Sequence, residues 1–194
     1  ETLTVMGCGL QARAGIRGFL TQFPSIRQVR LYNRSRAPME EVQRQYAGRA
    51  EVVICDTPAQ AVEGSRLILM ASGAREPLKV GMVKPGTTVI GIEGFRDIEP
   101  TLCQTADKWY LGYRRPDQDI INSTHLNPTG FVKNDYVFGD MTELLTGKVP
   151  GRESEDEIIV STHMGMGAHD VNCAEIVYRR ALEKGIGQRF VMEG

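Results

Sequence analysis

The chain has 194 residues and a mass of 21.5 kDa, which suits one large domain or one domain with an appended arm. Hydrophobic residues make up 41% and charged residues 24%, values that exclude an intrinsically disordered chain. The chain has a net charge of −1 and an isoelectric point near 6.4, so it lacks the basic excess of a nucleic-acid-binding protein. No nucleic-acid partner is therefore expected. No apolar run approaches the ~18 residues of a membrane span, and no signal-peptide pattern is present. We therefore expect a cytoplasmic protein that does not associate with membranes.

The cysteines and histidines are spread along the chain without metal-ligand spacing. No two cysteines form a C-x-x-C pair, which weighs against zinc and dithiol redox sites. We expect reduced thiols and no metal site. The residues concerned are Cys8, Cys55, Cys103, Cys173, His125, His163 and His169.

Short apolar runs predict strands, and helical periodicity between them predicts helices. Strands are expected at 3–6, 29–32, 51–55, 67–71, 87–92, 107–111 and 157–161. Helices are expected at 10–23, 39–46, 57–62, 78–83 and 138–145, and a long one at 170–184, ended by Gly185. The polar segment 114–134 carries no clear period and stays unassigned.

Strands that alternate with helices at this spacing predict right-handed βαβ units on a parallel sheet. Nearly continuous apolar strands, such as 67–71, are typical of a sheet that helices cover on both faces. The expected fold class is therefore α/β, a doubly wound (Rossmann) parallel sheet with a C-terminal helical extension.

Residues 7–12 read G-C-G-L-Q-A, a G-x-G-x-x-A pattern between an expected strand and an expected helix. In that context the pattern indicates a dinucleotide-binding turn. Gly7 permits the tight turn, Gly9 lacks the Cβ that would block a pyrophosphate, and Ala12 lets the helix pack on the strand. The helix N-terminus offers its free N–H groups to the phosphate. The predicted cofactor contacts here are Gly7, Gly9, Leu10, Gln11 and Ala12.

The residues after the second expected strand bear on the choice between NAD and NADP. An NAD-selective site usually places Asp or Glu there to hold the ribose hydroxyls. This chain has Asn33-Arg34-Ser35-Arg36, which offers a guanidinium and a hydroxyl suited to a 2′-phosphate. We predict NADP, bound by Asn33, Arg34 and Ser35, with NAD as the alternative. The competing interpretation is a turn at Asn33 with both arginines in solvent.

Segments along most of the chain resemble the ornithine cyclodeaminase/μ-crystallin family. The phosphate turn with its Gln11 is similar to that family's turn. The most specific matches are 147–152 (GKVPGR) and 165–170 (GMGAHD), which a generic Rossmann protein lacks. Further matching segments are 31–35 (LYNRS), 69–73 (LMASG), 84–87 (KPGT) and 89–92 (VIGI).

The resemblance implies a two-domain protein whose N-terminal domain binds substrate through Lys and Arg residues and forms the dimer. This sequence covers the Rossmann part and some of the return to that domain. It starts at Glu1 directly before a strand, so we expect an excised or truncated domain. The expected domain is 1–170, with a C-terminal helix at 171–194 that packs on the sheet or returns toward the missing domain. The implied partners are a small-molecule substrate, that domain or a separate subunit, and a second copy in a homo-oligomer.

The resemblance also places the strand at 69–73 against the nicotinamide, with 89–92 as the next strand. Ser72 ends its strand at the edge where ligands bind, although a cap or turn role competes with cofactor binding. The cofactor contacts expected here are Ala71, Ser72, Gly73 and Ile92.

The catalytic residues stay unknown, because the chain departs from the family after the fifth strand. Ornithine cyclodeaminases and related alanine dehydrogenases carry Gly-Gly-Asp or Gly-Ala-Asp there, and the Asp is the catalytic acid/base. That Asp falls at Phe95 in an ungapped match, and Asp97 would substitute only in a reshaped loop. Glu93, Asp97 and His169 are the candidates within this chain.

Three further residues lie near the glycine-containing segment 165–167, and we expect structural roles for them. We interpret His163 and His169 as loop histidines, although a general acid at this place is chemically apt. Asp170 is expected to stabilise the start of the long helix.

The function expected is the NADP(H)-binding domain of an oxidoreductase that acts on a cyclic imine or an α-amino acid. Without the motif Asp, the chain is nearer to a ketimine reductase than to a cyclodeaminase. An NAD-dependent ornithine cyclodeaminase, which is an ammonia lyase, is one alternative. A non-catalytic protein that binds NADP and a small ligand is the other. The chain alone is expected to be inactive, because the family's substrate-binding groups lie outside it.

Overall fold

The computed structural model describes residues 1–73, 78–92, 96–123, 127, 130, 133–188 and 190. The chain divides into two compact units, Glu1–Met164 and Gly165–Gly194. Three residues discussed above, Glu93, Phe95 and His125, lie outside the described part.

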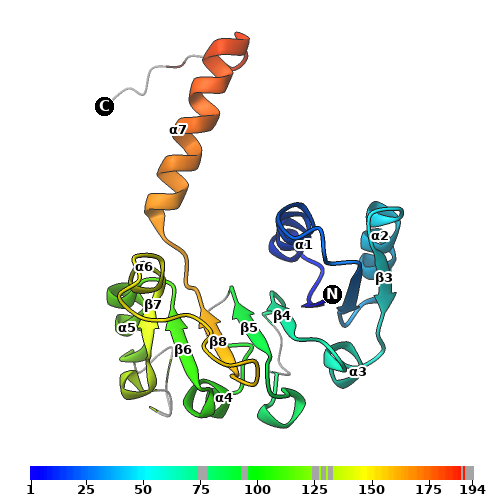
Figure 1. Cartoon of the computed structure of the whole chain (residues 1–194). Helices are drawn as coiled ribbons and strands as arrows, with labels where there is room; N and C mark the ends of the chain where they lie inside the picture. Colours follow the sequence, from blue (N-terminus) through cyan, green and yellow to red (C-terminus); the bar gives the residue numbers. More distant parts are fainter. Residues whose placement is uncertain are drawn as a thin grey trace. The chain divides into compact units, whose positions relative to one another are not determined.

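Unit 1 is built on a parallel sheet of eight strands (Figure 1). They are β1 (Thr2–Met6), β2 (Gln28–Tyr32), β3 (Glu51–Ile54), β4 (Leu67–Met70), β5 (Thr88–Gly91), β6 (Lys108–Leu111), β7 (Gly139–Asp140) and β8 (Ile159–Thr162). Their order is β3-β2-β1-β4-β5-β8-β6-β7. The chain runs outward from β1 to β3, crosses to β4 on the other side of β1, and continues to β5. The doubly wound α/β sheet predicted from the sequence is confirmed.

Helices cover both faces of this sheet and enclose two cores (Figure 1). The helices of unit 1 are α1 (Leu10–Gln22), α2 (Arg36–Tyr46), α3 (Pro58–Val62), α4 (Pro100–Thr105), α5 (Arg114–Ile121) and α6 (Met141–Leu145). α1 and α2 pack on one face, where Leu69 is buried, and α3 and α4 pack on the other with Ile68 and Met70. Successive residues of β4 are therefore buried in opposite cores, and this is why β4 is apolar throughout.

The segment expected as one helix at 138–145 is instead a short strand, β7, followed by α6. Asp140 is the reason for the difference. Its carboxylate accepts the N–H of Glu143 at 2.8 Å, and the Glu143 carboxylate accepts the N–H of Asp140 at 3.1 Å. This capping box needs extended backbone at Asp140, which therefore ends β7 and starts α6.

Other elements differ from the sequence prediction in extent or were not predicted. The helix expected at 78–83 is only the 3₁₀ turn η1 (Val80–Met82). A second such turn is η2 (Asn134–Tyr136), and α4 and α5 were not predicted. α5 lies in the unassigned polar segment, where only Asp117 and Ile121 of its eight residues are buried. One of these two is charged, so no apolar period marks the helix in the sequence. The helix expected at 57–62 is α3, and Thr57 caps it by accepting the N–H of Gln60 at 3.2 Å.

Unit 2 holds the C-terminal helix α7 (Gly167–Lys184). It begins before residue 170, and Asp170 lies in its first turn, where a carboxylate stabilises the helix. It ends at Gly185, whose φ of +63° is the left-handed conformation of a helix C-cap. In the part of the chain that is described, no helix combines the length and the apolar character that a membrane span requires.

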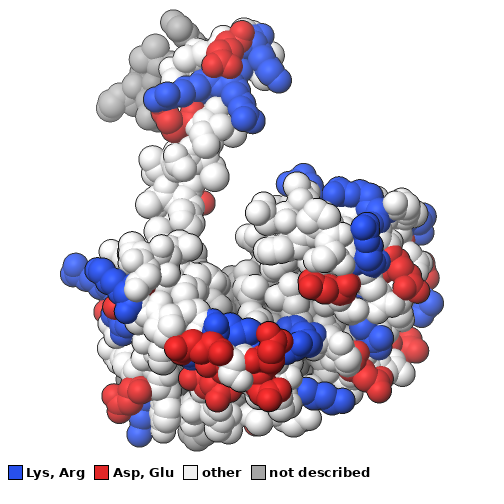
Figure 2. Space-filling view, viewed as in Figure 1, with Lys and Arg blue, Asp and Glu red and all other residues white. Residues whose placement is uncertain are grey.

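Charged side chains of both signs gather at the amino ends of β4, β5 and β8, as Figure 2 shows for one face. Arg66 pairs with Glu155 at 3.1 Å. The buried Lys108 pairs with Glu153 at 2.7 Å and Glu157 at 2.9 Å. These pairs hold the loop before β8 against the sheet, so the charges at this edge have a structural role.

Candidate functional site

The candidate site lies at the opposite, carboxyl edge of the sheet, where the direction of winding reverses. β1 lies between β2 and β4, and the sheet continues away from it on both sides. Met6 at the end of β1 is level with Met70 at the end of β4 and with the last residue of β2. Doubly wound sheets bind ligands in the crevice outside such a switch point. Three predicted segments, 7–12, 33–35 and 71–73, thus follow three neighbouring strands.

Gly7 is required by the backbone of the neighbouring strand. Its φ of +111° lies in the region that favours glycine. A Cβ built on Gly7 would lie 2.3 Å from the carbonyl oxygen of Ala71. The N–H of Gly7 donates to the carbonyl of Tyr32 at 2.8 Å. The need for glycine at position 7 therefore comes from the protein's own packing.

The N-terminus of α1 is open. Gly9 is the N-cap, with φ −71° and ψ −175°, and its helix has no side-chain cap and no acidic residue in its first turn. A Cβ built on Gly9 would meet no atom of the described residues within 4 Å. Leu10 and Gln11 are exposed beside it. The free N–H groups and the positive end of the helix dipole thus face solvent, the arrangement that binds phosphate groups.

α1 packs closely on β4 through two small residues. Ala12 is fully buried, which agrees with the packing role expected for it. One turn later, a Cβ built on Gly15 would lie 2.4 Å from Cδ2 of Leu69. Gly15 therefore lies in close contact with the Leu69 side chain of β4. Local sequence patterns did not predict this role, although its signal is a small residue three positions after Ala12.

The thiol of Cys8 lies in the core beneath the turn. Burial raises its pKa to about 11, and the Arg13 guanidinium lowers the pKa by a smaller amount. The thiol is therefore protonated at neutral pH and puts no negative charge next to the phosphate turn.

The two arginines after β2 have different surroundings. Arg36 pairs with Glu40 at 3.0 Å and with Asp56, which follows β3, at 3.7 Å. Among the described residues, the Arg34 guanidinium has neither a hydrogen-bond nor an ion-pair partner, and the side chain is exposed. Of the two, Arg34 is thus the arginine that is available to a ligand.

The residues around Arg34 form a turn into α2. The Asn33 side chain donates to the carbonyl of Ser35 at 3.0 Å, so the turn at Asn33 is present. Ser35 is the N-cap of α2, and its hydroxyl makes no cap bond. The first turn of α2 has no acidic residue. A second open helix N-terminus therefore lies beside Arg34.

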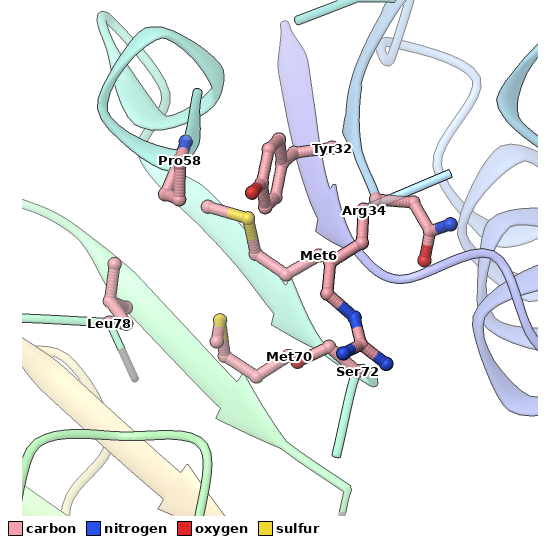
Figure 3. A pocket seen from close by; sticks show the side chains of 8 residues that line it. Met6, Tyr32, Arg34, Pro58, Met70, Ser72 and Leu78 are labelled. Carbon is pink, nitrogen blue, oxygen red and sulfur yellow. The ribbon is translucent and has the colours of Figure 1, made fainter. Parts of the chain in front are cut away.

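A small pocket of roughly 70 Å³ connects the ends of β1, β2 and β4. Its residues are Met6, Tyr32, Asn33, Arg34, Pro58, Met70, Ser72 and Leu78. Figure 3 shows Met6, Met70 and Tyr32 converging on the pocket, while the Arg34 side chain extends toward Ser72. The site therefore combines an apolar floor with a guanidinium at its rim. Sequence patterns did not predict the apolar residues as part of the site.

Ser72 is held by Asp97. The N–H and the hydroxyl of Ser72 both donate to Oδ2 of Asp97, at 3.3 and 3.4 Å. Asp97 has no exposed surface. Asp97 therefore holds the segment after β4 and the segment after β5 together. This is a structural role for one of the three catalytic candidates. Ile92, which follows β5, donates its N–H to the carbonyl of Met70 at 3.1 Å.

The two loop histidines belong to different units. In unit 1, Nε2 of His163 lies 2.9 Å from Oγ of Ser161, and the ring packs against Gly112, where an added Cβ would lie 2.8 Å from Nδ1. His163 therefore folds back on its own strand. In unit 2, His169 is exposed in the first turn of α7. Within the described residues, no group of His, Cys, Asp and Glu has the arrangement of a metal site.

Asp117 is a buried carboxylate that the sequence analysis missed. Its Oδ2 accepts the N–H of Gly112 at 2.8 Å and that of Tyr113 at 3.2 Å, while Oδ1 has no hydrogen-bond partner among the described residues. Burial raises its pKa and the charge of Asp140 raises it further, against the effect of the two N–H bonds.

This raised pKa predicts how stability depends on pH. A carboxyl whose pKa is higher in the folded state stabilises the fold at pH values below the unfolded pKa, about 4. That stabilisation is lost as pH rises through the folded pKa. The D117N variant stays neutral and keeps an acceptor for both N–H groups. We expect the free energy of unfolding of the unmodified chain, relative to D117N, to fall over this range. Urea unfolding of both chains at several pH values measures this difference in the free energy of unfolding. A difference that rises with pH would contradict the prediction.

The family model that describes the ornithine cyclodeaminase/mu-crystallin family matches residues 1–185. The chain belongs to the ornithine cyclodeaminase/mu-crystallin family. The family resemblance read from segments such as 147–152 and 165–170 is thereby confirmed.

Three similar proteins illustrate the match. N-((2S)-2-amino-2-carboxyethyl)-L-glutamate dehydrogenase of Staphylococcus aureus is 27% identical, over 96% of this chain and 57% of its own length. A Delta(1)-pyrroline-2-carboxylate reductase of Bacillus cereus is 25% identical, over 97% of this chain and 60% of its own. An archaeal alanine dehydrogenase dimer with bound NAD has the same fold, with a TM-score of 0.83 and 22% identity. That match covers 100% of this chain and 61% of the other. The chain thus spans about three fifths of the length of these three proteins.

Proposed function

We propose that unit 1 binds NADP(H), with the pyrophosphate at the turn of residues 7–12. The observation that carries this proposal is the open N-terminus of α1 at the switch point of the sheet. Gly9 leaves room for the phosphate, and the N–H groups of Leu10, Gln11 and Ala12 meet it with the helix dipole behind them.

The residues after β2 support NADP over NAD. Arg34 is without a partner among the described residues, and Ser35 stands at the uncapped N-terminus of α2. Both would bind a 2′-phosphate, and Asn33 would hold the turn. The carboxylate of Asp56, which follows the neighbouring β3, is paired with Arg36. The archaeal relative binds NAD, so the preference for NADP is argued only from the residues of this chain.

In the intact protein, we propose hydride transfer between NADP(H) and a cyclic imine or an α-amino acid. The nicotinamide supplies or accepts the hydride when the cofactor is bound. Ala71, Ser72 and Gly73 follow β4, which is next to β1, and Ile92 follows β5 beyond it. These residues would orient the nicotinamide, with Ser72 held in place by Asp97. The names of two relatives, a dehydrogenase of an amino-acid derivative and a pyrroline-2-carboxylate reductase, support this substrate class.

The substrate-binding groups are proposed to lie outside this chain, in the two fifths of the relatives' length that it does not span. We also propose that residues 171–194, which lie within unit 2, return toward that further part. The archaeal relative is a dimer, which supports a homo-oligomer for the intact protein. We also propose that the intact protein is cytoplasmic.

Calorimetric titration of the 194-residue chain with NADPH tests the cofactor assignment. We expect saturable binding of one NADPH per chain, and no oxidation of NADPH when a cyclic ketimine is added. The first result follows from the turn, and the second from the missing substrate groups. Absence of NADPH binding would refute the proposed function, and turnover by this chain would place the catalytic groups within it.

A further inference from the structure

Arg13 connects the phosphate turn to α2. Its Nε donates to the carbonyl oxygen of Cys8 at 3.1 Å, and its Nη2 lies 2.6 Å from Oε2 of Glu41. The hydroxyl of Tyr46 donates to the backbone carbonyl of Arg13 at 3.2 Å. The guanidinium of Arg13 thus binds both the phosphate turn and α2.

The contact with Cys8 determines which way one peptide of the turn faces. A peptide unit is planar and trans, so its C=O and N–H point in opposite directions. With the Cys8 carbonyl held by Arg13, the N–H of Gly9 points away from Arg13. Gly9 could accept the rotated peptide, because glycine tolerates positive φ. A rotated peptide would turn the Cys8 carbonyl oxygen around and lose a donor from the turn.

We propose that Arg13 is a positioning residue that holds the Cys8–Gly9 peptide in the orientation that binds phosphate, and that Glu41 holds Arg13. This inference rests on the proposed function. Because Glu41 compensates its charge, Arg13 acts here through the direction of its hydrogen bonds. Glu41 is ionised at neutral pH, since the bond from Arg13 lowers its pKa.

The chain offers matched variants to test this role. Arg13→Met removes both donor groups, and Arg13→Lys keeps the charge but has one nitrogen for two acceptors. Arg17→Met is the control, because Arg17 is an exposed arginine one turn later on the same helix. Tyr46→Phe removes the bond to the Arg13 backbone and leaves its side-chain contacts in place.

We expect Arg13→Met and Arg13→Lys to weaken NADPH and NADH binding by the same factor, on the order of tenfold. The Arg17→Met and Tyr46→Phe variants should bind nearly as the unmodified chain does. Calorimetry measures the affinities. Unchanged affinity in Arg13→Met would overturn the proposal, and so would full affinity in Arg13→Lys, because a simple charge would then suffice.

A measurement without cofactor separates this proposal from the cofactor assignment. In the free chain, the amide ¹⁵N and ¹H resonances of Gly9 report the orientation of the Cys8–Gly9 peptide. We expect Arg13→Met to shift these resonances and Arg17→Met to leave them in place, with the unfolding temperature measured for each variant. Unshifted Gly9 resonances in Arg13→Met would overturn the positioning role, whereas a failure of the unmodified chain to bind NADPH would overturn only the proposed function.

Discussion

Replacing Gly9 with valine is expected to abolish dinucleotide binding while the fold stays intact. Gly9 has φ −71°, which any residue adopts, and a Cβ there would meet no described atom within 4 Å. The valine side chain would instead fill the space through which a pyrophosphate approaches the N–H groups of α1. Valine is a poorer N-cap than glycine, so a modest loss of stability, about 1 kcal/mol, is expected.

Gly7→Ala is the matched control for this experiment. Its added Cβ would lie 2.3 Å from the Ala71 carbonyl oxygen, at a φ of +111°. We therefore expect Gly7→Ala to lower the free energy of unfolding by more than about 1 kcal/mol. Urea unfolding and calorimetry with NADPH should then separate the two glycines, one required for the ligand and the other for the fold. Unchanged NADPH affinity in Gly9→Val would refute the phosphate site.

The parts of the fold that the sequence predicted are those that local patterns determine. Buried strands such as 67–71 are apolar throughout, because helices cover both faces of the sheet. The phosphate turn could be predicted because its glycines and the start of α1 are adjacent in the chain. Gly185 likewise ends α7 through its own backbone conformation.

The features that the sequence did not predict depend on contacts between distant segments. Ser72 is bound by Asp97, 25 positions later in the chain, and Gly15 is constrained by Leu69. No local pattern specifies such partners, since packing of the whole sheet brings them together. Similarly, β7 was missed because two residues pair with β6 just before a helix cap.

The choice of cofactor combines both kinds of information. The sequence alone assigned a 2′-phosphate to Arg34 with Asn33 and Ser35, and left a turn with both arginines in solvent as the competing interpretation. The structure pairs Arg36 with Glu40 and with Asp56 from the neighbouring β3, so the two arginines can be tested separately.

Arg34→Ala is expected to remove most of the preference of the chain for NADP(H) over NAD(H). A hydrogen bond to a charged group contributes roughly 1.5–3 kcal/mol, so the unmodified chain should bind NADPH about ten- to a hundredfold more tightly than NADH. The variant should bind NADH as before, because Arg34 would contact only the 2′-phosphate. Calorimetric titration of both chains with both cofactors at low salt measures the change.

Arg36→Ala serves as the control for charge. It also removes one positive charge near α2, but from a guanidinium that already has two acidic partners. We expect it to change the NADPH-to-NADH affinity ratio by less than about threefold, since only a screened charge is lost. Raised salt should weaken NADPH binding by the unmodified chain more than NADH binding, and this difference should vanish in Arg34→Ala. Equal affinities of the unmodified chain for the two cofactors would contradict the assignment of Arg34, as would an Arg36→Ala variant that loses the preference while Arg34→Ala keeps it.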